Sequence, residues 1–138
     1  MTATYLLDTN HLSRAVEIGS PVRLRITELA ERGAKVGTCV PVLCEVEAGI
    51  HRLREPEKYR QGLDRLLRRI RVWPMLPSTA RVYGGIYQDL RTRGRALSQV
   101  DMMLAALATE MSATLVTSDK DFTALPDIRV ESWFPAVP

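Results

Sequence analysis

A chain of 138 residues provides one domain that buries about two thirds of its unfolded surface, so it needs neither disulfides nor a structural metal to fold. Hydrophobic residues make up 46% of the chain and charged residues 25%, which excludes a disordered protein, and no apolar run reaches the roughly 20 residues of a membrane-spanning helix. The net charge is +3 at pH 7, and most of the 19 basic residues are arginines, which bind phosphate well, but this balance alone discriminates little between functions.

The first half of the chain alternates short strands with helices. We expect, in chain order, a strand at 4–7, a helix from residue 10, a helix at 21–32, a strand at 35–40, and helices opening at Pro41 and Pro56. Asn10 can cap the first helix, and Pro21 suits the first turn of the second, which Gly33 ends. The helices after Pro41 and Pro56 carry leucine, valine or isoleucine at helical spacing, which predicts a buried face on each.

The second half continues the alternation. We expect a strand at 71–76, helices at 78–93 and 98–111, and strands at 114–117 and 129–133. Pro74 cannot donate to a sheet, so the strand at 71–76 is expected at a sheet edge, and Gly84 and Gly85 weaken the helix that follows. The pattern predicts a three-layer α/β fold with a mostly parallel sheet, and the sequence contains neither a dinucleotide-binding nor a P-loop glycine motif.

Domain organisation and compartment follow from simpler signals. Neither a linker nor a repeat divides the chain, so we expect a single domain over residues 1–138 with a loose proline-rich tail from about residue 134. Cys39 and Cys44 do not form a C-x-x-C pair, and we expect free, mostly buried thiols. A basic, apolar leader does not precede the first strand, so the expected compartment is the cytoplasm, without contact to a membrane.

Four carboxylates stand where the chain leaves a predicted strand or enters a predicted helix: Asp8, Glu45, Asp101 and Asp119. Asp8 follows the first strand directly and Asp119 follows the fourth closely, so in a parallel sheet both emerge at the carboxyl edge, where α/β proteins place their sites. Glu45 lies in the first turns of the helix after the second strand and belongs to the same edge. Asp101 is less constrained, because its helix begins after a loop.

Each acid also has a purely structural explanation: a turn for Asp8 and Asp119, a favourable helix dipole for Glu45, and a capping box with Ser98 for Asp101. Glu45 and Asp101, however, share helix stripes with small residues, where a charge is costly unless it is paired. Converging carboxylates repel one another. A hard divalent ion such as Mg²⁺, which binds a few carboxylates together with waters and phosphates, removes that repulsion.

Five segments form a pattern along the chain: Leu6-Leu7-Asp8-Thr9-Asn10, Glu45-x-x-x-Gly49, Asp101 with Ala105 and Ala108, Leu115-Val116-Thr117-Ser118-Asp119-Lys120-Asp121-Phe122, and Val130-x-x-Trp133. With them the chain resembles the PIN-domain family and, more narrowly, the VapC toxins of bacterial toxin–antitoxin pairs. The resemblance runs from Tyr5 to Trp133. Its specific parts are the opening L-L-D-T-N and the late T-S-D-x-D-F.

The resemblance implies a five-stranded parallel sheet in the order 3-2-1-4-5, flanked by helices. By this resemblance, the family's catalytic and metal-binding acids correspond to Asp8, Glu45, Asp101 and Asp119. A hydroxyl that helps to hold the site corresponds to Thr117. Asp121 matches a less constant acid whose role stays open. Gln99 departs from the expected pattern, and His11 stands at a variable position.

The resemblance also implies an activity and partners. The chain would be an endoribonuclease that hydrolyses RNA phosphodiester bonds with Mg²⁺, for which Mn²⁺ substitutes, and it would be a homodimer inhibited by a cognate small antitoxin. An excess of large apolar residues on the early helices predicts a groove for an amphipathic partner segment; they are Leu12, Val16, Ile18, Leu24, Leu63, Leu66 and Leu67. An arginine or lysine of the partner would lie among the four acids in place of the metal.

Basic residues near the acids are the predicted phosphate contacts. Arg91, Arg93 and Arg95 precede the helix of Asp101, although an exposed helix end explains them as well. The sequence has two histidines, His11 and His51, and neither is expected to act directly, so a bound metal is expected to activate the attacking water.

Three other functions fit parts of the pattern. A haloacid-dehalogenase-like phosphatase needs a second acid where Asn10 stands, and a catalytic lysine in the interval between Lys58 and Lys120, which contains no lysine. A non-catalytic PIN module for RNA binding or scaffolding usually lacks some of the four acids. A housekeeping RNA or DNA nuclease without an antitoxin stays open, as do the RNA target and the number of metal ions.

Overall fold

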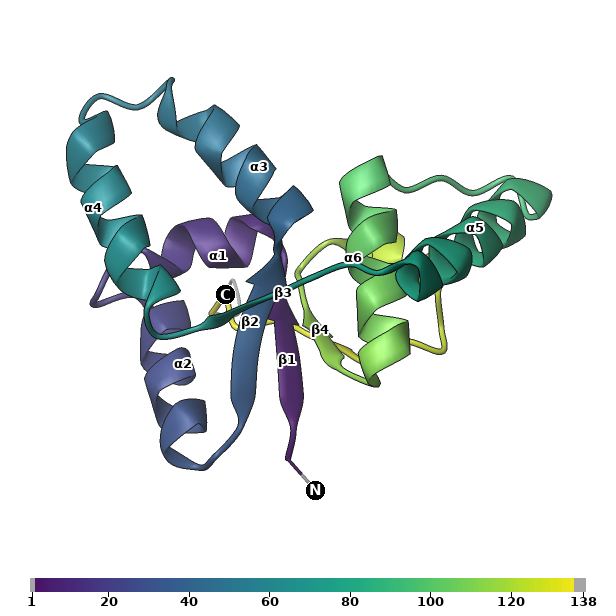
Figure 1. Cartoon of the computed structure of the whole chain (residues 1–138), viewed down its shortest axis with the longest axis horizontal. Coiled ribbons are helices and arrows are strands. Elements are labelled where there is room, and N and C mark those ends of the chain that lie inside the picture. The colour runs from purple at the N-terminus through teal and green to yellow at the C-terminus, as the bar shows by residue number, and fades with distance from the viewer. Residues whose placement is uncertain (1, 136–138) are drawn as a thin grey trace.

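Within residues 2–135, the part described by the computed structural model, five strands form a single sheet (Figure 1). They are β1 (Thr4–Leu7), β2 (Lys35–Cys39), β3 (Arg71–Trp73), β4 (Thr114–Val116) and β5 (Val130–Glu131). Their order is β3-β2-β1-β4-β5, and each neighbouring pair is parallel. The predicted sheet and its strand order are therefore confirmed.

Helices cover both faces of the sheet. They are α1 (Thr9–Ala15), α2 (Pro21–Glu31), α3 (Val40–Ile50), α4 (Pro56–Leu67), α5 (Pro77–Thr92), α6 (Gln99–Met111) and the 3₁₀ helix η1 (Lys120–Ala124). In Figure 1, α1, α2 and α4 lie to the left of the sheet, α3 lies above it, and α5 and α6 lie to its right. This is the predicted three-layer arrangement, which parallel sheets adopt because both of their faces are apolar.

The two central strands form the middle of the core. Leu6 and Leu7 of β1 and Leu115 and Val116 of β4 are all fully buried. Helix α3 adds one buried residue per turn, at Val42, Val46 and Ile50. A run of small and apolar residues from Leu104 to Ala108 buries α6 on the other side. The core therefore holds the ends of β1 and β4 in place, and the predicted acids Asp8 and Asp119 follow those ends in the chain.

The first helix begins earlier than the sequence pattern predicts. We expected Asn10 to cap it, but α1 begins at Thr9 and its N-cap is Asp8. Asp8 has an extended backbone (φ −76°, ψ 178°), and its carboxylate accepts the backbone N–H of His11, which an N-cap side chain must do. Asp8 therefore ends β1 and caps α1 at the same time.

Three further expectations can be compared with the structure. β3 ends at Trp73, before the predicted residue 76, because Pro74 has no N–H to donate, and its predicted edge position is confirmed. α5 is unbroken by its two glycines, because it packs along α6. Cys39 is buried as expected, whereas Cys44 is exposed, so only one of the two free thiols lies in the core.

The last described residues pack against the body of the domain. Trp133 is buried and Phe134 half-buried, and residues 136–138, on which the expected loose tail also falls, lie outside the described part. Across residues 2–135, the helices are all too short or too polar to cross a membrane.

Candidate active site

The carboxyl edge of the sheet holds the predicted acids. Asp8 directly follows β1, and its backbone N–H donates to the Val116 carbonyl oxygen of β4 at 3.1 Å. Asp119 lies three residues beyond Val116. From this pair of central strands the sheet grows toward β2 on one side and β5 on the other, so the two acids stand at the point where the strand order reverses.

Asp8 is buried and held by three donors. Its Oδ1 accepts the backbone N–H of His11 at 2.8 Å and lies 2.9 Å from His11 Nδ1. Its Oδ2 accepts the Thr117 hydroxyl at 2.6 Å. The Thr117 Oγ1 in turn accepts the backbone N–H of Asp119 at 3.1 Å. The structure therefore places Thr117 between the two acids, where its hydroxyl sets the orientation of one and the position of the other.

Asp101 lies in the first turn of α6, where its backbone N–H donates to Ser98 Oγ at 3.1 Å. Burial raises the pKa of its carboxyl group, and a hydrogen bond with Ser98 lowers it. The charges of Asp119, Glu45 and Asp8, in that order, raise the pKa further. Asp101 is therefore within electrostatic reach of all three other predicted acids.

The remaining two acids are exposed. Glu45 on α3 accepts the Thr9 hydroxyl at 2.5 Å, which joins the start of α1 to the middle of α3. Asp119 caps η1, because its Oδ1 accepts the backbone N–H of Asp121 at 2.9 Å. The Asp121 carboxylate is exposed.

The four carboxylates fit a hard cation in their chemistry. They offer only oxygen ligands, which Mg²⁺ prefers, and a cation would relieve the like charges that act on Asp101. In the described part of the chain, however, no three His, Cys, Asp or Glu side chains stand close enough together to hold an ion as they are placed. Because hydrogen bonds fix Asp8, ion binding requires rearrangement mainly of the exposed Glu45 and Asp119.

The predicted phosphate-binding arginines do not form one free cluster. Arg93 donates to Asp89 Oδ2 at 2.5 Å and to the Ala124 carbonyl oxygen of η1 at 2.6 Å, so it ties α5 to η1. Arg91 donates to a tyrosine hydroxyl one turn back on α5. The Arg95 side chain is exposed. Of the three, Arg93 is the one that hydrogen bonds tie to another element of the described chain.

His11 contacts the candidate site, although the sequence pattern did not place it there. It is completely buried, and besides its contact with Asp8 it accepts the backbone N–H of Trp133 on Nε2 at 3.1 Å. Its position three residues after a helix-capping aspartate was the signal available in the sequence, since such residues lie side by side on the first turn.

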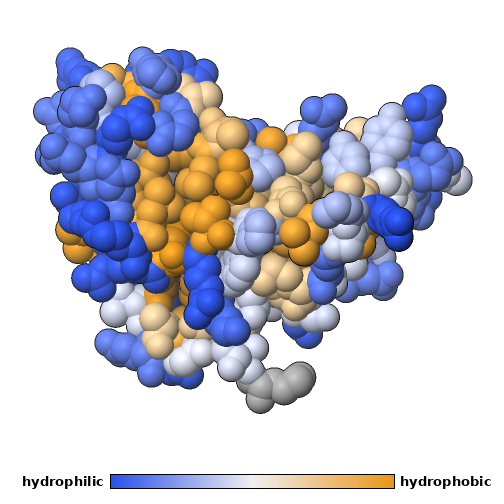
Figure 2. Space-filling model, in the orientation of Figure 1, coloured by the Kyte–Doolittle hydropathy of each residue, from blue (hydrophilic) through white to orange (hydrophobic). Residues whose placement is uncertain are grey.

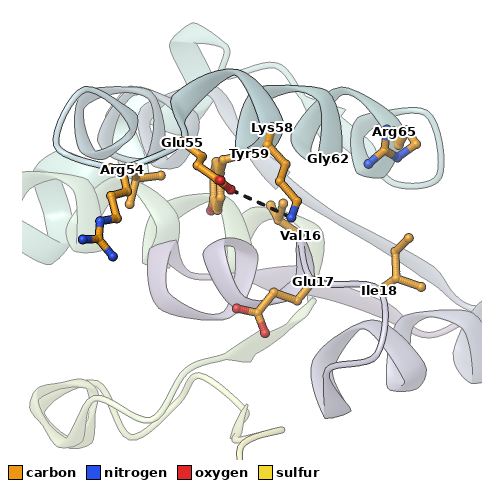
Figure 3. A pocket seen from close by; sticks show the side chains of 10 residues that line it. Val16, Glu17, Ile18, Arg54, Glu55, Lys58, Tyr59, Gly62 and Arg65 are labelled. Atoms are coloured by element: carbon orange, nitrogen blue, oxygen red, sulfur yellow. Dashed lines mark ion pairs between the residues drawn. The ribbon is translucent and has the colours of Figure 1, made fainter.

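A groove leads from the acidic edge along α4. A first hollow of about 250 Å³ lies between α1 and α3, with Glu45 in its lining. It shares Leu53 and Tyr59 with a second hollow of about 640 Å³, shown in Figure 3, between α4 and the end of α1. The second shares Ile18 and Arg65 with a third of about 520 Å³ between α2 and α4. We call the three together the α4 groove.

The lining of the α4 groove differs in part from the prediction. Leu12, Leu63 and Leu66 are fully buried and belong to the core. Ile18 and Leu24, by contrast, are 66% and 60% exposed and form an apolar wall.

The far end of the α4 groove is basic, because Arg65, Arg68 and Arg69 line it. Buried Arg23 lies beside them and donates to the Ala15 carbonyl oxygen at 2.9 Å. Burial lowers the pKa of Arg23, and the charges of Arg69 and Arg65 lower it further, so these cations crowd one another.

Fold and site together define a class of protein: an α/β domain whose parallel sheet gathers carboxylates, suited to a hard divalent ion, where its strand order reverses. The chain belongs to the PIN domain family, whose model matches residues 5–128.

Similar proteins are known in sequence and in structure. The chain is 26% identical to Ribonuclease VapC2 of Rickettsia felis and 22% identical to Ribonuclease VapC2 of Haemophilus influenzae, each over 130 residues that cover 94% of this chain and 97% of the relative. A chain in the crystal structure of VapBC2 from Rickettsia felis bound to a promoter DNA fragment superposes with a TM-score of 0.85 at 24% identity, covering 95% of this chain and 99% of that one. A chain of FitAcB from Neisseria gonorrhoeae superposes with a TM-score of 0.73 at 26% identity, covering 91% and 95%.

Proposed function

We propose that this protein is a Mg²⁺-dependent endoribonuclease of the cytoplasm that acts as the toxin of a toxin–antitoxin pair. The observation that carries the proposal is the buried Asp8 carboxylate, which Thr117 holds within electrostatic reach of Asp101. Burial raises the pKa of Asp101, and the charges of Asp119, Glu45 and Asp8 raise it further. The similarity to proteins named Ribonuclease VapC supports RNA as the substrate.

One group of residues would bind the ion, and another group would bind the RNA. Asp8 and Asp101 would bind Mg²⁺ directly, and Asp119 and Glu45 would complete its surroundings directly or through water. A bound ion would supply a water molecule of lowered pKa and positive charge at the scissile phosphate. Thr117 and His11 keep the Asp8 carboxylate in one orientation, so it does not need to reorganise when substrate arrives. Arg95 and Arg91 would contact phosphates of the RNA.

The α4 groove is the proposed binding site of the antitoxin. Its apolar wall suits an amphipathic segment, and its basic end suits acidic residues on the same segment. Its other end opens beside Glu45, so a bound segment would bring a cationic side chain to the acids and displace the metal. Structures similar to this chain include VapBC complexes, which supports a protein partner.

A second copy of the chain is the proposed partner for another surface. Figure 2 shows an apolar area over the middle of the face that carries β2, β3 and α3. Val40 of α3, Val72 of β3 and Leu76 shortly after β3 are exposed large apolar residues. A dimer mass in light scattering is the result we expect.

Metal dependence gives the test of the proposed reaction. Purified protein should cleave single-stranded RNA internally in Mg²⁺ or Mn²⁺, and cleavage should stop in excess chelator and return when Mg²⁺ is added back. Zn²⁺ and Ca²⁺ should substitute poorly, because an all-oxygen site with waters favours octahedral ions. Cleavage undiminished in chelator would overturn the proposed mechanism.

A further inference from the structure

The buried imidazole of His11 connects two parts of the chain that lie far apart in sequence. It is on α1, one turn after Asp8, and its Nδ1 lies 2.9 Å from Asp8 Oδ1. Its Nε2 accepts the backbone N–H of Trp133 at 3.1 Å, and Trp133 follows β5 near the end of the described chain. Both ring nitrogens are therefore engaged.

The direction of these hydrogen bonds follows from what each group can do. A backbone N–H can only donate, so Nε2 must be an acceptor without a proton. The ring proton is then on Nδ1, from which it donates to Asp8 Oδ1. A directed path runs from the Trp133 N–H through the His11 ring to the Asp8 carboxylate.

Two aromatic contacts hold the end of this path in place. The Phe134 ring stacks on the His11 ring, with centroids 4.0 Å apart and planes at 11°. The Trp133 ring packs against the Tyr5 ring of β1, with the ring centroids 5.5 Å apart. The indole N–H of Trp133 donates to Glu131 Oε1 at 2.7 Å. The segment after β5 is thus fastened to β1, the strand that delivers Asp8.

The hydrogen bonds also determine which oxygen of Asp8 stays available. Oδ1 accepts two donors, the N–H and the ring of His11, and each carboxylate oxygen has about two acceptor positions. Oδ2 accepts only Thr117 among the contacts in the described chain, so it keeps a position for a cation. A carboxylate free to rotate would not keep this difference.

We propose that His11 is a positioning residue, held by Trp133 and Phe134, that fixes the Asp8 carboxylate with Oδ2 directed to the ligand. The segment after β5 then controls the affinity of the site for its cation without touching the cation. The link to catalysis rests on the proposed function. The hydrogen-bond path itself does not.

Three variants separate positioning from packing. His11→Phe keeps the ring and its stacking on Phe134 but removes both ring hydrogen bonds. His11→Asn supplies an N–H donor near the place of Nδ1. Phe134→Ala removes the stacked ring and leaves His11 and Asp8 unchanged. Tyr87→Ala, which removes an exposed aromatic ring on α5, is the matched control.

The test uses Mg²⁺ as the probe and measures binding by amide chemical shifts of the ¹⁵N-labelled protein, with thermal unfolding in chelator as the check on folding. We expect His11→Phe to weaken Mg²⁺ binding roughly tenfold or more, as losing an outer partner of a metal ligand does, and Phe134→Ala to weaken it less. His11→Asn should recover most of the Mg²⁺ affinity, and Tyr87→Ala should leave the Mg²⁺ affinity at the wild-type value. Folded His11→Phe and Phe134→Ala proteins that bind Mg²⁺ like the wild type would overturn the proposal.

A second readout needs neither metal nor RNA. In the metal-free protein, imidazole ¹⁵N spectra should show the His11 proton on Nδ1 only, and Phe134→Ala should broaden or shift that signal. A proton on Nε2 would overturn the proposal even in an active ribonuclease. The expected tautomer in a protein that binds no Mg²⁺ would instead contradict the proposed function and leave the path from Trp133 to Asp8 standing.

Discussion

Asp101 combines an electrostatic cost in the metal-free protein with its proposed role as a metal ligand. Its carboxylate is half-buried and faces three like charges, so its pKa is raised in the folded protein. The folded state therefore binds the proton more tightly than the unfolded state. The stability that this provides is present at acidic pH and is lost as the pH rises through the raised pKa. At neutral pH, without a cation, Asp101 destabilises the fold.

We therefore predict that Asp101→Asn raises the urea midpoint of the metal-free protein at pH 7. The gain should shrink toward zero as the pH falls below about 4, where Asp101 is protonated in both states. Mg²⁺ should stabilise the wild type and not the variant. A variant less stable than the wild type at pH 7 in chelator would show that repulsion does not act on Asp101.

Thr117 allows a second test at a single position. Thr117→Val keeps the shape of the side chain but leaves the buried Asp8 Oδ2 without its donor, which should cost roughly 1–3 kcal/mol of unfolding free energy. Activity should fall at least about tenfold, because the carboxylate is no longer held. Thr117→Ser keeps the hydroxyl, so it should retain most of the unfolding free energy and most of the cleavage activity of the wild type. Denaturant unfolding and RNA cleavage measure the two effects, and a Thr117→Val protein with wild-type values in both would contradict the assigned role.

Helices and strands followed the sequence pattern closely, and their ends followed it less well. The parallel α/β class and the carboxyl-edge position of Asp8 and Asp119 were predictable from the alternation of apolar strands and helices, which permits few arrangements. The strand order was predictable only from the resemblance to the PIN-domain family. The start of α1 was not, because Asn10 and Asp8 are both good caps and only the extended backbone at the end of β1 decides between them. The role of His11 depends on Trp133, a contact across nearly the whole chain that no local pattern records.

Two glycines provide a matched test of how the elements pack. A Cβ on Gly37 of β2 would lie 2.2 Å from the Arg71 carbonyl oxygen, so Gly37→Ala should push β3 away and cost about 1–3 kcal/mol or more. No heavy atom of another part of the structure lies within 4 Å of a Cβ on Gly49 of α3, so Gly49→Ala should stabilise the helix by up to about 1 kcal/mol. Thermal unfolding of the two variants and the wild type measures both changes in stability. Equal stabilities for the two variants would contradict the tight β2–β3 contact.

The molecule as a whole presents opposite charges at the two ends of the α4 groove. The acidic edge lies at one end and Arg65, Arg68 and Arg69 lie at the other, with exposed Ile18 and Leu24 beside them. A single amphipathic segment with a cationic and an acidic end would therefore fit in one orientation. The sequence predicted an apolar groove and a cationic partner residue among the acids, and the basic far end of the groove adds to that prediction.

We predict that Ile18→Asp and Arg68→Glu each weaken binding of the antitoxin purified with the native protein by at least about tenfold, the effect of losing one well-placed contact. Arg68→Glu should also flatten the dependence of the dissociation constant on salt, because it removes an ion pair. Arg81→Glu on the exposed face of α5 is the charge-matched control. Titration calorimetry at two salt concentrations measures these effects, and wild-type affinity in both groove variants would place the partner elsewhere.

We propose above that carboxylates at the carboxyl edge form a metal-dependent RNA-cleaving site. Its most direct test is the single-turnover rate of RNA cleavage by Asp101→Asn in saturating Mg²⁺, beside the wild type and Asp64→Asn, an exposed acid on α4. We predict that Asp101→Asn loses at least about 100-fold in rate, more than outer partners of a metal ligand usually contribute, while remaining folded, and that Asp64→Asn keeps the wild-type rate. Cleavage by Asp101→Asn at the wild-type rate would contradict the assignment of the site.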